Sequence, residues 1–428
     1  LVAAALIESG RTKDPLMHVD DLLADPASFL EEHYLTDGGK SGVRSVRCAA
    51  DVLKTLARHE GYADEGLAQR IKNVAAYFEA EKLRTSFGET LVKFGNGPLH
   101  SRYGFAETLR TTCSGGSKRS RTGLNVQQLP RKMPKELLAL MLEEIGEEID
   151  VRTCFVPREG FVQSSTDYGS LEMVTFAQAN LDLFGWSTLA DALNNDVDPH
   201  SLFAASLLGR SYEDVLAGVA AEDPVCVEAR QRAKVGNFGF PGSMGAEKFQ
   251  VYARGQNLFL SIEQCRELKS GYKEQWKETR QFFGYASDML NSAGGEATYV
   301  DARSGFVSGG CGYSDFCNRH FQTPAAVGAT AALWRYVREC YDERLATPLL
   351  GSRVTAFVHD EVRAEHPIEC ASEAADRGRE LMIEVMQPVT PGVKVKASTA
   401  LMSRWYKGAK EVRDAHGRLV PWEPKKRS

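Results

Sequence analysis

Asp167 has the type and the position that binding of a divalent cation requires. Residues 161–165 alternate in a strand-like pattern and a helical apolar rhythm starts at Leu171, so Asp167 falls where a strand should end. A carboxylate there is held by a rigid sheet and is open to a cleft, as a metal ligand must be. Taken alone, helix capping is the simpler explanation for Asp167. Two further stretches change that interpretation.

The first of these stretches carries two basic residues and one aromatic residue at a spacing of four. Arg230, Lys234 and Phe238 would therefore share one face of a helix. At about 1.5 Å per residue, that face is about 12 Å long, the length scale of a nucleoside triphosphate. Pro241 disfavours helical geometry at Phe240, so we expect this helix to end early.

The second stretch predicts a β-hairpin with charged residues at its tip. Small and branched apolar residues alternate over residues 354–358 and again over 362–364. His359, Asp360 and Glu361 lie between the two runs. A second set of carboxylates is therefore expected at a turn between two strands.

Together, the three stretches resemble the polymerase motifs of the family A DNA polymerases, the group of bacterial polymerase I and the phage replicases. In that family the motifs are strand-Asp-Tyr-Ser-Gln-Ile-Glu, Arg-x3-Lys-x3-Phe-Gly and His-Asp-Glu, and their order and separations agree with this chain. The resemblance implies a phage-type, DNA-directed DNA polymerase that adds deoxynucleotides to a primer 3′ end in DNA replication or repair. Its partners would be primer–template DNA and deoxynucleoside triphosphates.

The same resemblance implies an α+β fold, the right-hand polymerase fold, with an antiparallel palm sheet, helical fingers and a helical thumb. The segments would be a partial thumb at 1–95, palm at 96–180 and 301–410, fingers at 181–300 and a mobile tail at 411–428. Within the last palm segment, the pattern predicts a helix over 370–386 and a strand over 393–397.

Metal and phosphate roles follow from the resemblance. Asp167 and Asp360 would bridge two Mg²⁺ ions about 3.5–4 Å apart. Arg230 and Lys234 would hold and neutralise the triphosphate, and Phe238 would stack on the incoming base.

Further substrate contacts are implied around these motifs. Glu172 would close off the 2′ position of the sugar, where a bulky side chain rejects a hydroxyl by a clash. Tyr168 belongs to the same motif. His200, in Asp198-Pro199-His200-Ser201, matches the family's Asp-x-His-Thr, whose His touches the triphosphate. The Tyr that follows the second motif in the family is replaced here by Gly242.

Several residues resemble the family's contacts to DNA. An Arg and two amides that read the minor groove, where correct base pairs present similar acceptors, correspond to Arg110, Asn125 and Gln128. The family's amide-bearing helix corresponds to Asn318 and Gln322, with a helix start predicted at Thr323-Pro324. At the hairpin tip, DNA contacts are implied for His359 and Glu361, with Glu361 supporting the site or the primer end.

Two basic loops have no decided role. Residues 115–123 form an insert relative to the family, and an added backbone contact and an ordinary surface loop explain it equally well. The glycine-rich stretch with Lys40, Arg44 and Arg47 lies in an otherwise helical region. It is either a solvated turn or a thumb tip that contacts phosphates.

The composition sets wider bounds. With 428 residues and 43% apolar residues, the chain can bury a large core in two or three subdomains. Nine scattered cysteines without a Cys-x-x-Cys pair favour reduced thiols in the cytoplasm. No apolar run is long enough to cross a membrane, and the start at Leu1 without a leader predicts a fragment. The net charge of −5 argues mildly against nucleic acid binding, but charge along a groove matters more than the total.

Two rival functions are weighed against DNA synthesis. A single-subunit RNA polymerase shares the palm and the two metal-binding Asp residues, but Glu172 argues against the use of ribonucleotides. A DNA-binding or clamp-like protein without activity would have no reason to keep Asp167, Lys234 and Asp360 together.

Overall fold

The computed structural model describes residues 65–424, except residues 96, 118–119, 131–132, 134–137, 139–140, 145 and 147–149. The basic loop with Lys40, Arg44 and Arg47, and most of the predicted thumb segment, lie outside the described residues.

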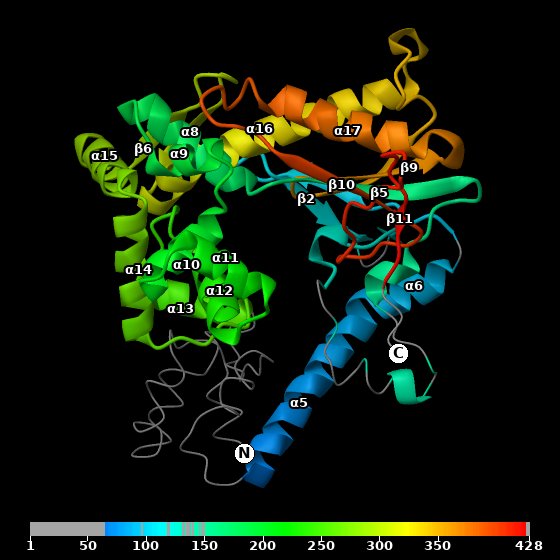
Figure 1. The fold of residues 1–428 in the computed structure, drawn as a ribbon, viewed down its shortest axis with the longest axis horizontal. Coiled ribbons are helices and arrows are strands. Elements are labelled where there is room, and N and C mark those ends of the chain that lie inside the picture. Colours follow the sequence, from blue (N-terminus) through cyan, green and yellow to red (C-terminus); the bar gives the residue numbers. More distant parts are fainter. Residues whose placement is uncertain are drawn as a thin grey trace.

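The structure is built around a five-stranded sheet in the order β11-β10-β5-β9-β8 (Figure 1). The strands β10, β5, β9 and β8 pair in antiparallel fashion, and β11 runs parallel to β10. Their bounds are β5 Phe161–Tyr168, β8 Arg353–Val358, β9 Glu361–Pro367, β10 Ala397–Met402 and β11 Pro421–Trp422. The predicted strand before Asp167 and the predicted hairpin around residues 359–360 are both confirmed.

The two faces of β5 have different neighbours, as its alternating sequence requires. Val162 packs with Ala371 and Ala375 of helix α17 (Ala371–Met386), which with α16 (Tyr313–Tyr341) covers one face of the sheet (Figure 1). Ser165 and Asp167 line a pocket on the other face. The covered face therefore stabilises the strand, and the polar face remains available for chemistry.

A group of helices follows β5 and packs beside the sheet (Figure 1). Side chains of Ser187, Asp198, Ser211, Asp223 and Ser261 accept hydrogen bonds from the first turns of five of them, as N-caps do. Four large aromatic residues of these helices and their connections are buried: Tyr272, Trp276, Phe282 and Phe283. The helices are α8 Leu171–Phe184, α9 Thr188–Asn194, α10 Pro199–Leu208, α11 Tyr212–Ala220, α12 Pro224–Gly239, α13 Ala246–Gly255, α14 Ile262–Gln275 and α15 Glu278–Ser292.

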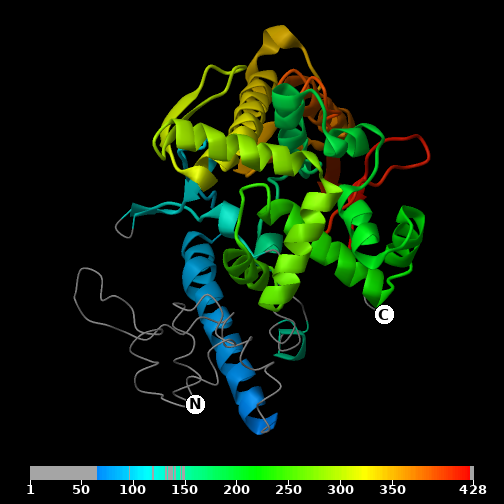
Figure 2. The ribbon, with the colours of Figure 1, turned by 90° about the vertical axis from the view of Figure 1, so that its left-hand side faces the viewer.

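The remaining elements lie before β5 and between the larger helices. Helix α5 extends away from the rest of the chain as one long helix (Figure 2). The helical elements are α5 Glu65–Leu83, a π-helical turn at Arg84–Gly88, α6 Glu89–Phe94 and short 3₁₀ turns at Val126–Gln128, Val151–Cys154, Glu343–Leu345 and Ile368–Cys370. The small two-stranded sheets pair β1 Arg102–Phe105 with β2 Thr111–Ser114, β3 Gly116–Ser117 with β4 Ser120–Arg121, and β6 Ala297–Val300 with β7 Val307–Cys311.

The predictions made from two proline residues had opposite outcomes. Helix α12 ends at Gly239, two residues before Pro241, as predicted. The helix start predicted at Thr323-Pro324 is wrong, because α16 continues through Pro324 without a break. A proline inside a helix leaves the carbonyl four residues earlier, here that of His320, without its helical donor. The next carbonyl, that of Phe321, accepts a 2.8 Å hydrogen bond from the Thr175 hydroxyl, so α8 contacts α16 beside the proline.

The C-terminal predictions also need correction. The last strand of the predicted palm was expected at 393–397, but β10 begins only at Ala397. The preceding turn is held by the Gln387 side chain, whose amide donates to the carbonyls of Thr390 and Val393. The tail after residue 410 was predicted to be mobile, but Leu419 is buried and Arg413 forms two hydrogen bonds with Asp376. Buried apolar residues therefore anchor a segment that is mostly polar in sequence.

Within the described residues, no helix combines the length and the apolar character needed to cross a membrane.

Candidate active site

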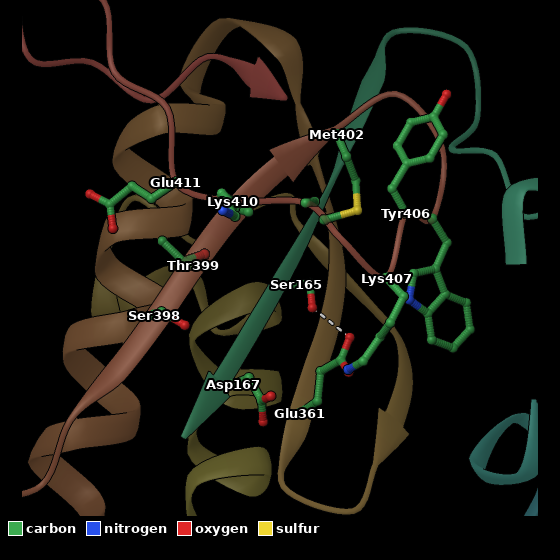
Figure 3. Close-up of a pocket in the computed structure, with 13 residues that line it drawn as sticks. Ser165, Asp167, Glu361, Ser398, Thr399, Met402, Tyr406, Lys407, Lys410 and Glu411 are labelled. Carbon is green, nitrogen blue, oxygen red and sulfur yellow. Dashed lines mark hydrogen bonds and ion pairs between the residues drawn. The ribbon is translucent and has the colours of Figure 1, made fainter. Parts of the chain in front are cut away.

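Carboxylates from two neighbouring strands meet at a pocket on the face of the sheet opposite α17. Asp167 on β5 is the register partner of Glu361 on β9 and of Ser398 on β10. Directly opposite residues of antiparallel strands have Cα atoms about 4.5–5.5 Å apart, so the two acidic side chains share one pocket (Figure 3). Strand register therefore places Asp167 directly opposite Glu361, the acid that follows the hairpin turn.

Glu361 is buried but surrounded by groups that favour its ionised form. Its Oε1 accepts a 2.5 Å hydrogen bond from the Ser165 hydroxyl (Figure 3), and Arg363 and Lys407 lie 3.5 Å from its two oxygens. Burial by itself would raise the pKa of Glu361, but Arg363, Lys407 and the Ser165 hydroxyl lower the pKa below its usual value. Glu361 is thus a fixed negative charge beside Asp167.

Two buried arginine side chains stack on the Trp405 ring, and one of them, Arg363, also pairs with Glu361. The guanidinium carbon of Arg363 lies 4.2 Å from the ring centroid of Trp405, and that of Arg152 lies 4.5 Å from it. Arg363 also donates to the Gln163 side chain over 2.5 Å. This network was not predicted from the sequence. The available signal was the alternation of Glu361 and Arg363 on one face of a short strand.

Asp360 occupies the two-residue turn between β8 and β9 and is half-buried. Burial and the nearby charge of Glu361 raise the pKa of Asp360 to about 6, while Arg110 and Lys407 oppose that shift. The preceding residue, His359, is exposed and has a φ of 62°, a conformation that two-residue hairpin turns require. Asp360 therefore lies close to Glu361 at the tip of the hairpin.

Arg110 and Glu172 form an ion pair, although the sequence analysis gave them different roles. Arg110 was assigned to DNA and Glu172 to the sugar of the nucleotide. Glu172 lies in the first turn of α8, directly after β5, and its side chain is 21% exposed. The ion pair places Arg110, which was predicted to contact DNA, against Glu172, which was predicted to close off the 2′ position of the sugar.

The amides predicted to read DNA differ in their surroundings. Asn125 caps a 3₁₀ turn by accepting from the Gln127 backbone N–H over 3.2 Å, whereas Gln128 is exposed. Gln127, which was not predicted, donates to the Thr111 hydroxyl over 2.9 Å.

Tyr168 requires a correction. It is buried in the main core, and its hydroxyl donates to the Met382 carbonyl over 2.7 Å. Because its ring and its hydroxyl are both committed to packing against α17, we assign Tyr168 to the core and not to substrate binding.

A second cluster lies on α10 and α12. Arg230 donates to Asp198 over 3.0 Å and to the Ser201 hydroxyl over 3.1 Å, so its guanidinium is held in one orientation. His200 is buried, and its ring centroid lies 5.5 Å from that of Phe238. The structure therefore brings together the His of one predicted motif and the Arg and Phe of another, and Lys234 is one turn from Arg230 on the same helix.

Helix α16 carries Asn318 and Gln322 four residues apart, and both are half-buried. Asn318 also explains the glycine that departs from the family pattern. A Cβ atom at residue 242 would lie 2.2 Å from Asn318 Oδ1, so a residue larger than Gly242 would displace this amide. The turn after α12 is thus in contact with α16.

The acidic residues suit an open magnesium site, completed by substrate and water, better than a closed site made of protein ligands alone. Among the described residues, no group of three or more His, Cys, Asp or Glu side chains is arranged as a complete metal site. Magnesium is ordinarily held by one or two carboxylates together with substrate phosphates and water. Asp167 and Asp360, from a strand end and an adjacent hairpin tip, match that pattern.

The fold and the site define the class of protein. A mainly antiparallel sheet carries acidic residues on adjacent strands, beside helices with a fixed Arg, a Lys and a buried His. Residues 27–407 match the model of DNA polymerase family A, and this chain belongs to that family.

Curated relatives of the chain are DNA polymerases I. The enzyme of Aquifex aeolicus (strain VF5) is 22% identical over 263 residues, which are 60% of this chain and 42% of that protein. The thermostable enzyme of Thermus thermophilus is 26% identical over 379 residues, 86% of this chain and 38% of that protein. The chain therefore spans about two fifths of the length of these relatives.

A solved structure shows the same fold. The POL domain of Pol1 from M. smegmatis, in complex with DNA primer-template and dNTP, superposes with a TM-score of 0.59 at 19% sequence identity. The match covers 95% of this chain and 63% of that chain.

Proposed function

We propose that this chain is the polymerase region of a DNA-directed DNA polymerase that extends a primer 3′ end with deoxynucleotides in DNA replication or repair. The observation that carries the proposal is the pairing of Asp167 with Glu361, next to Asp360, on adjacent strands. Membership of DNA polymerase family A over residues 27–407 supports it. The relatives that match are DNA polymerases I.

In this proposal residues 96–180 and 301–410 are the palm, which holds α16, α17 and every strand of the sheet except β11. Residues 181–300 are the fingers, and residues 1–95 are part of the thumb. The proposal is supported by the contacts of α8 with both α9 and α16, since they join the helical group to the sheet layer.

Three groups of residues would have separate roles in the reaction. Asp167 and Asp360 would hold magnesium, which when bound supplies activation of the primer 3′ hydroxyl and neutralisation of phosphate charge. Arg230, oriented by Asp198, would bind the triphosphate together with Lys234. Glu361, kept ionised by Arg363, would fix the local charge beside Asp167.

The test is primer extension with deoxynucleotides or ribonucleotides, with and without Mg²⁺. We expect extension only with deoxynucleotides and only when Mg²⁺ is present. Equal extension with ribonucleotides would favour an RNA polymerase, and no extension with either nucleotide would refute the proposal.

Replacing Glu172 with Ala is expected to raise the use of ribonucleotides relative to deoxynucleotides by about tenfold, or about 1.4 kcal/mol. The reason is that Glu172 would occupy the space beside the sugar 2′ carbon. Single-nucleotide incorporation with the two nucleotide types measures the ratio. Because Arg110 pairs with Glu172, Arg110→Ala serves as a control: an equal shift there would assign the selectivity to the ion pair, and an unchanged ratio in Glu172→Ala would remove Glu172 from the pocket wall.

Replacing Phe238 with Tyr is expected to reduce discrimination against dideoxynucleotides by about tenfold. The parent ring has no polar group to compensate for a missing 3′ hydroxyl, whereas the Tyr hydroxyl would supply one modest hydrogen bond of about 1 kcal/mol. Chain-termination assays compare the two proteins. Phe78 on α5 is exposed and lies outside the predicted fingers, so Phe78→Tyr is the matched control. Equal termination by the parent and Phe238→Tyr would show that Phe238 does not line the sugar pocket.

A further inference from the structure

Three buried side chains form a hydrogen-bonded relay behind the predicted phosphate-binding cluster. Trp276 Nε1 lies 2.9 Å from Asn237 Oδ1, and Asn237 Nδ2 lies 3.0 Å from His200 Nδ1. Trp276 and Asn237 are at most 1% exposed, and His200 is 5% exposed. None of the three could exchange its partner for water without opening the core.

The orientation of the Asn237 amide follows from its neighbours. An indole N–H can only donate, so the amide atom that faces Trp276 must be the oxygen. The amide nitrogen then faces the Pro199 carbonyl, 3.3 Å away, which can only accept. Both neighbours therefore require the same orientation of the amide.

The orientation of the amide determines the tautomer of the histidine. Because an amide N–H₂ only donates, His200 Nδ1 must accept and cannot carry a proton. The proton of the neutral ring is therefore on Nε2, which makes no hydrogen bond within the described part of the chain. A neutral imidazole with Nε2–H is a donor suited to an anionic oxygen.

The charges around the ring also favour its neutral form. Burial, the largest cause, acts together with Arg230 and Lys234 to lower the pKa of His200 to about 4, while Asp198 opposes the shift. At neutral pH the ring thus remains uncharged beside two cations that would bind phosphate.

We propose that Asn237 and Trp276 are positioning residues that hold His200 as an Nε2–H donor to a phosphate oxygen of the incoming nucleoside triphosphate. The part of this inference that concerns the nucleotide rests on the proposed function, whereas the tautomer does not. The relay joins α10, α12 and the end of α14, so the donor would be set before the nucleotide arrives.

The tautomer is measured by long-range ¹H–¹⁵N correlation spectra of the whole chain with ¹⁵N-labelled histidine at pH 7. The chain has nine histidines, and a His200→Gln variant identifies the signals of His200. We expect His200 to carry its proton on Nε2 alone. A proton on Nδ1 in the parent protein would overturn the proposal.

The variant Asn237→Asp keeps the size of the side chain and the acceptor for Trp276 but removes the donor to His200. We expect Nδ1 of His200 to become protonated in this variant. Asn180→Asp is the matched control, because Asn180 is an equally buried amide that donates to the Phe176 carbonyl on α8. Unchanged ring signals in a folded Asn237→Asp variant would overturn the proposal.

Should Asn237→Asp fail to fold, Trp276→Phe tests the other end of the relay. This variant keeps an aromatic ring but removes the N–H that orients the amide, so a fraction of His200 should gain a proton on Nδ1. A His200 signal identical to that of the parent would count against the relay.

The nucleotide part is tested by steady-state extension with Asn237→Leu, for which we expect KM for the deoxynucleotide to rise about tenfold with a smaller change in kcat. An unchanged KM would overturn this part. If the parent protein itself extends no primer, the proposed function fails, while the ring signals still decide the relay.

Discussion

Asp360→Asn and Asp167→Asn are each expected to lower primer extension by about a thousandfold or more, while primer–template binding stays close to that of the parent. Either substitution keeps the shape of the side chain and removes an anionic oxygen that magnesium would need. For Asp360 it also removes the repulsion from Glu361, so the variant should fold normally. Single-turnover extension and a fluorescence binding assay measure the two quantities separately.

An exposed carboxylate provides the control for this experiment. Asp288 lies on the surface of α15, so Asp288→Asn should extend primers like the parent. Extension by Asp360→Asn within about tenfold of the parent would contradict the assignment of both Asp residues as metal ligands. Loss of primer–template binding would instead point to a misfolded hairpin.

Arg363→Met is expected to lower the free energy of unfolding by about 3 kcal/mol at pH 7, the scale for a buried charge that loses its partner. The variant leaves Glu361 buried without the cation 3.5 Å away and leaves the Gln163 side chain without its donor. Urea denaturation followed by circular dichroism measures the change. Arg344→Met is the control, because Arg344 pairs with Asp342 at the surface with 83% of its side chain exposed, and its loss should be much smaller.

The pH dependence gives this prediction a definite sign. The pKa of Glu361 is lowered in the folded parent, so its contribution to stability is present above its unfolded pKa and is lost as the pH falls through the folded value. Without Arg363 the folded pKa rises, so the difference between variant and parent should shrink as the solution is acidified. The double variant Arg363→Met/Glu361→Gln should recover most of the loss at pH 7. A variant as stable as the parent at pH 7 would mean that Ser165 and Lys407 suffice for Glu361.

Local patterns predicted most of the elements near the site. The strand before Asp167 follows from two-residue alternation, and the helix with Arg230, Lys234 and Phe238 follows from four-residue spacing. The hairpin around Asp360 follows from two alternating runs separated by a short polar turn. In each case the residues that determine the structure are close together in the chain, so periodicity and turn chemistry were sufficient.

Local patterns gave wrong predictions where a segment contacts residues that are distant in the sequence. Pro324 predicts a helix start by itself, yet α16 runs through it with the Thr175 hydroxyl on the nearby Phe321 carbonyl. The tail after residue 410 is polar in sequence, yet Leu419 is buried and Arg413 pairs with Asp376. Neither partner can be found by a window of neighbouring residues.

The sequence by itself determined which residues could perform chemistry and which strands and helices carry them. Only the tertiary structure decided their states: Glu361 is ionised because Arg363 is buried beside it, and the tautomer of His200 depends on Asn237 and Trp276. The physical reason is that the energy of a charge or a proton inside a protein depends on the groups within a few ångströms, and folding brings those groups from distant parts of the chain.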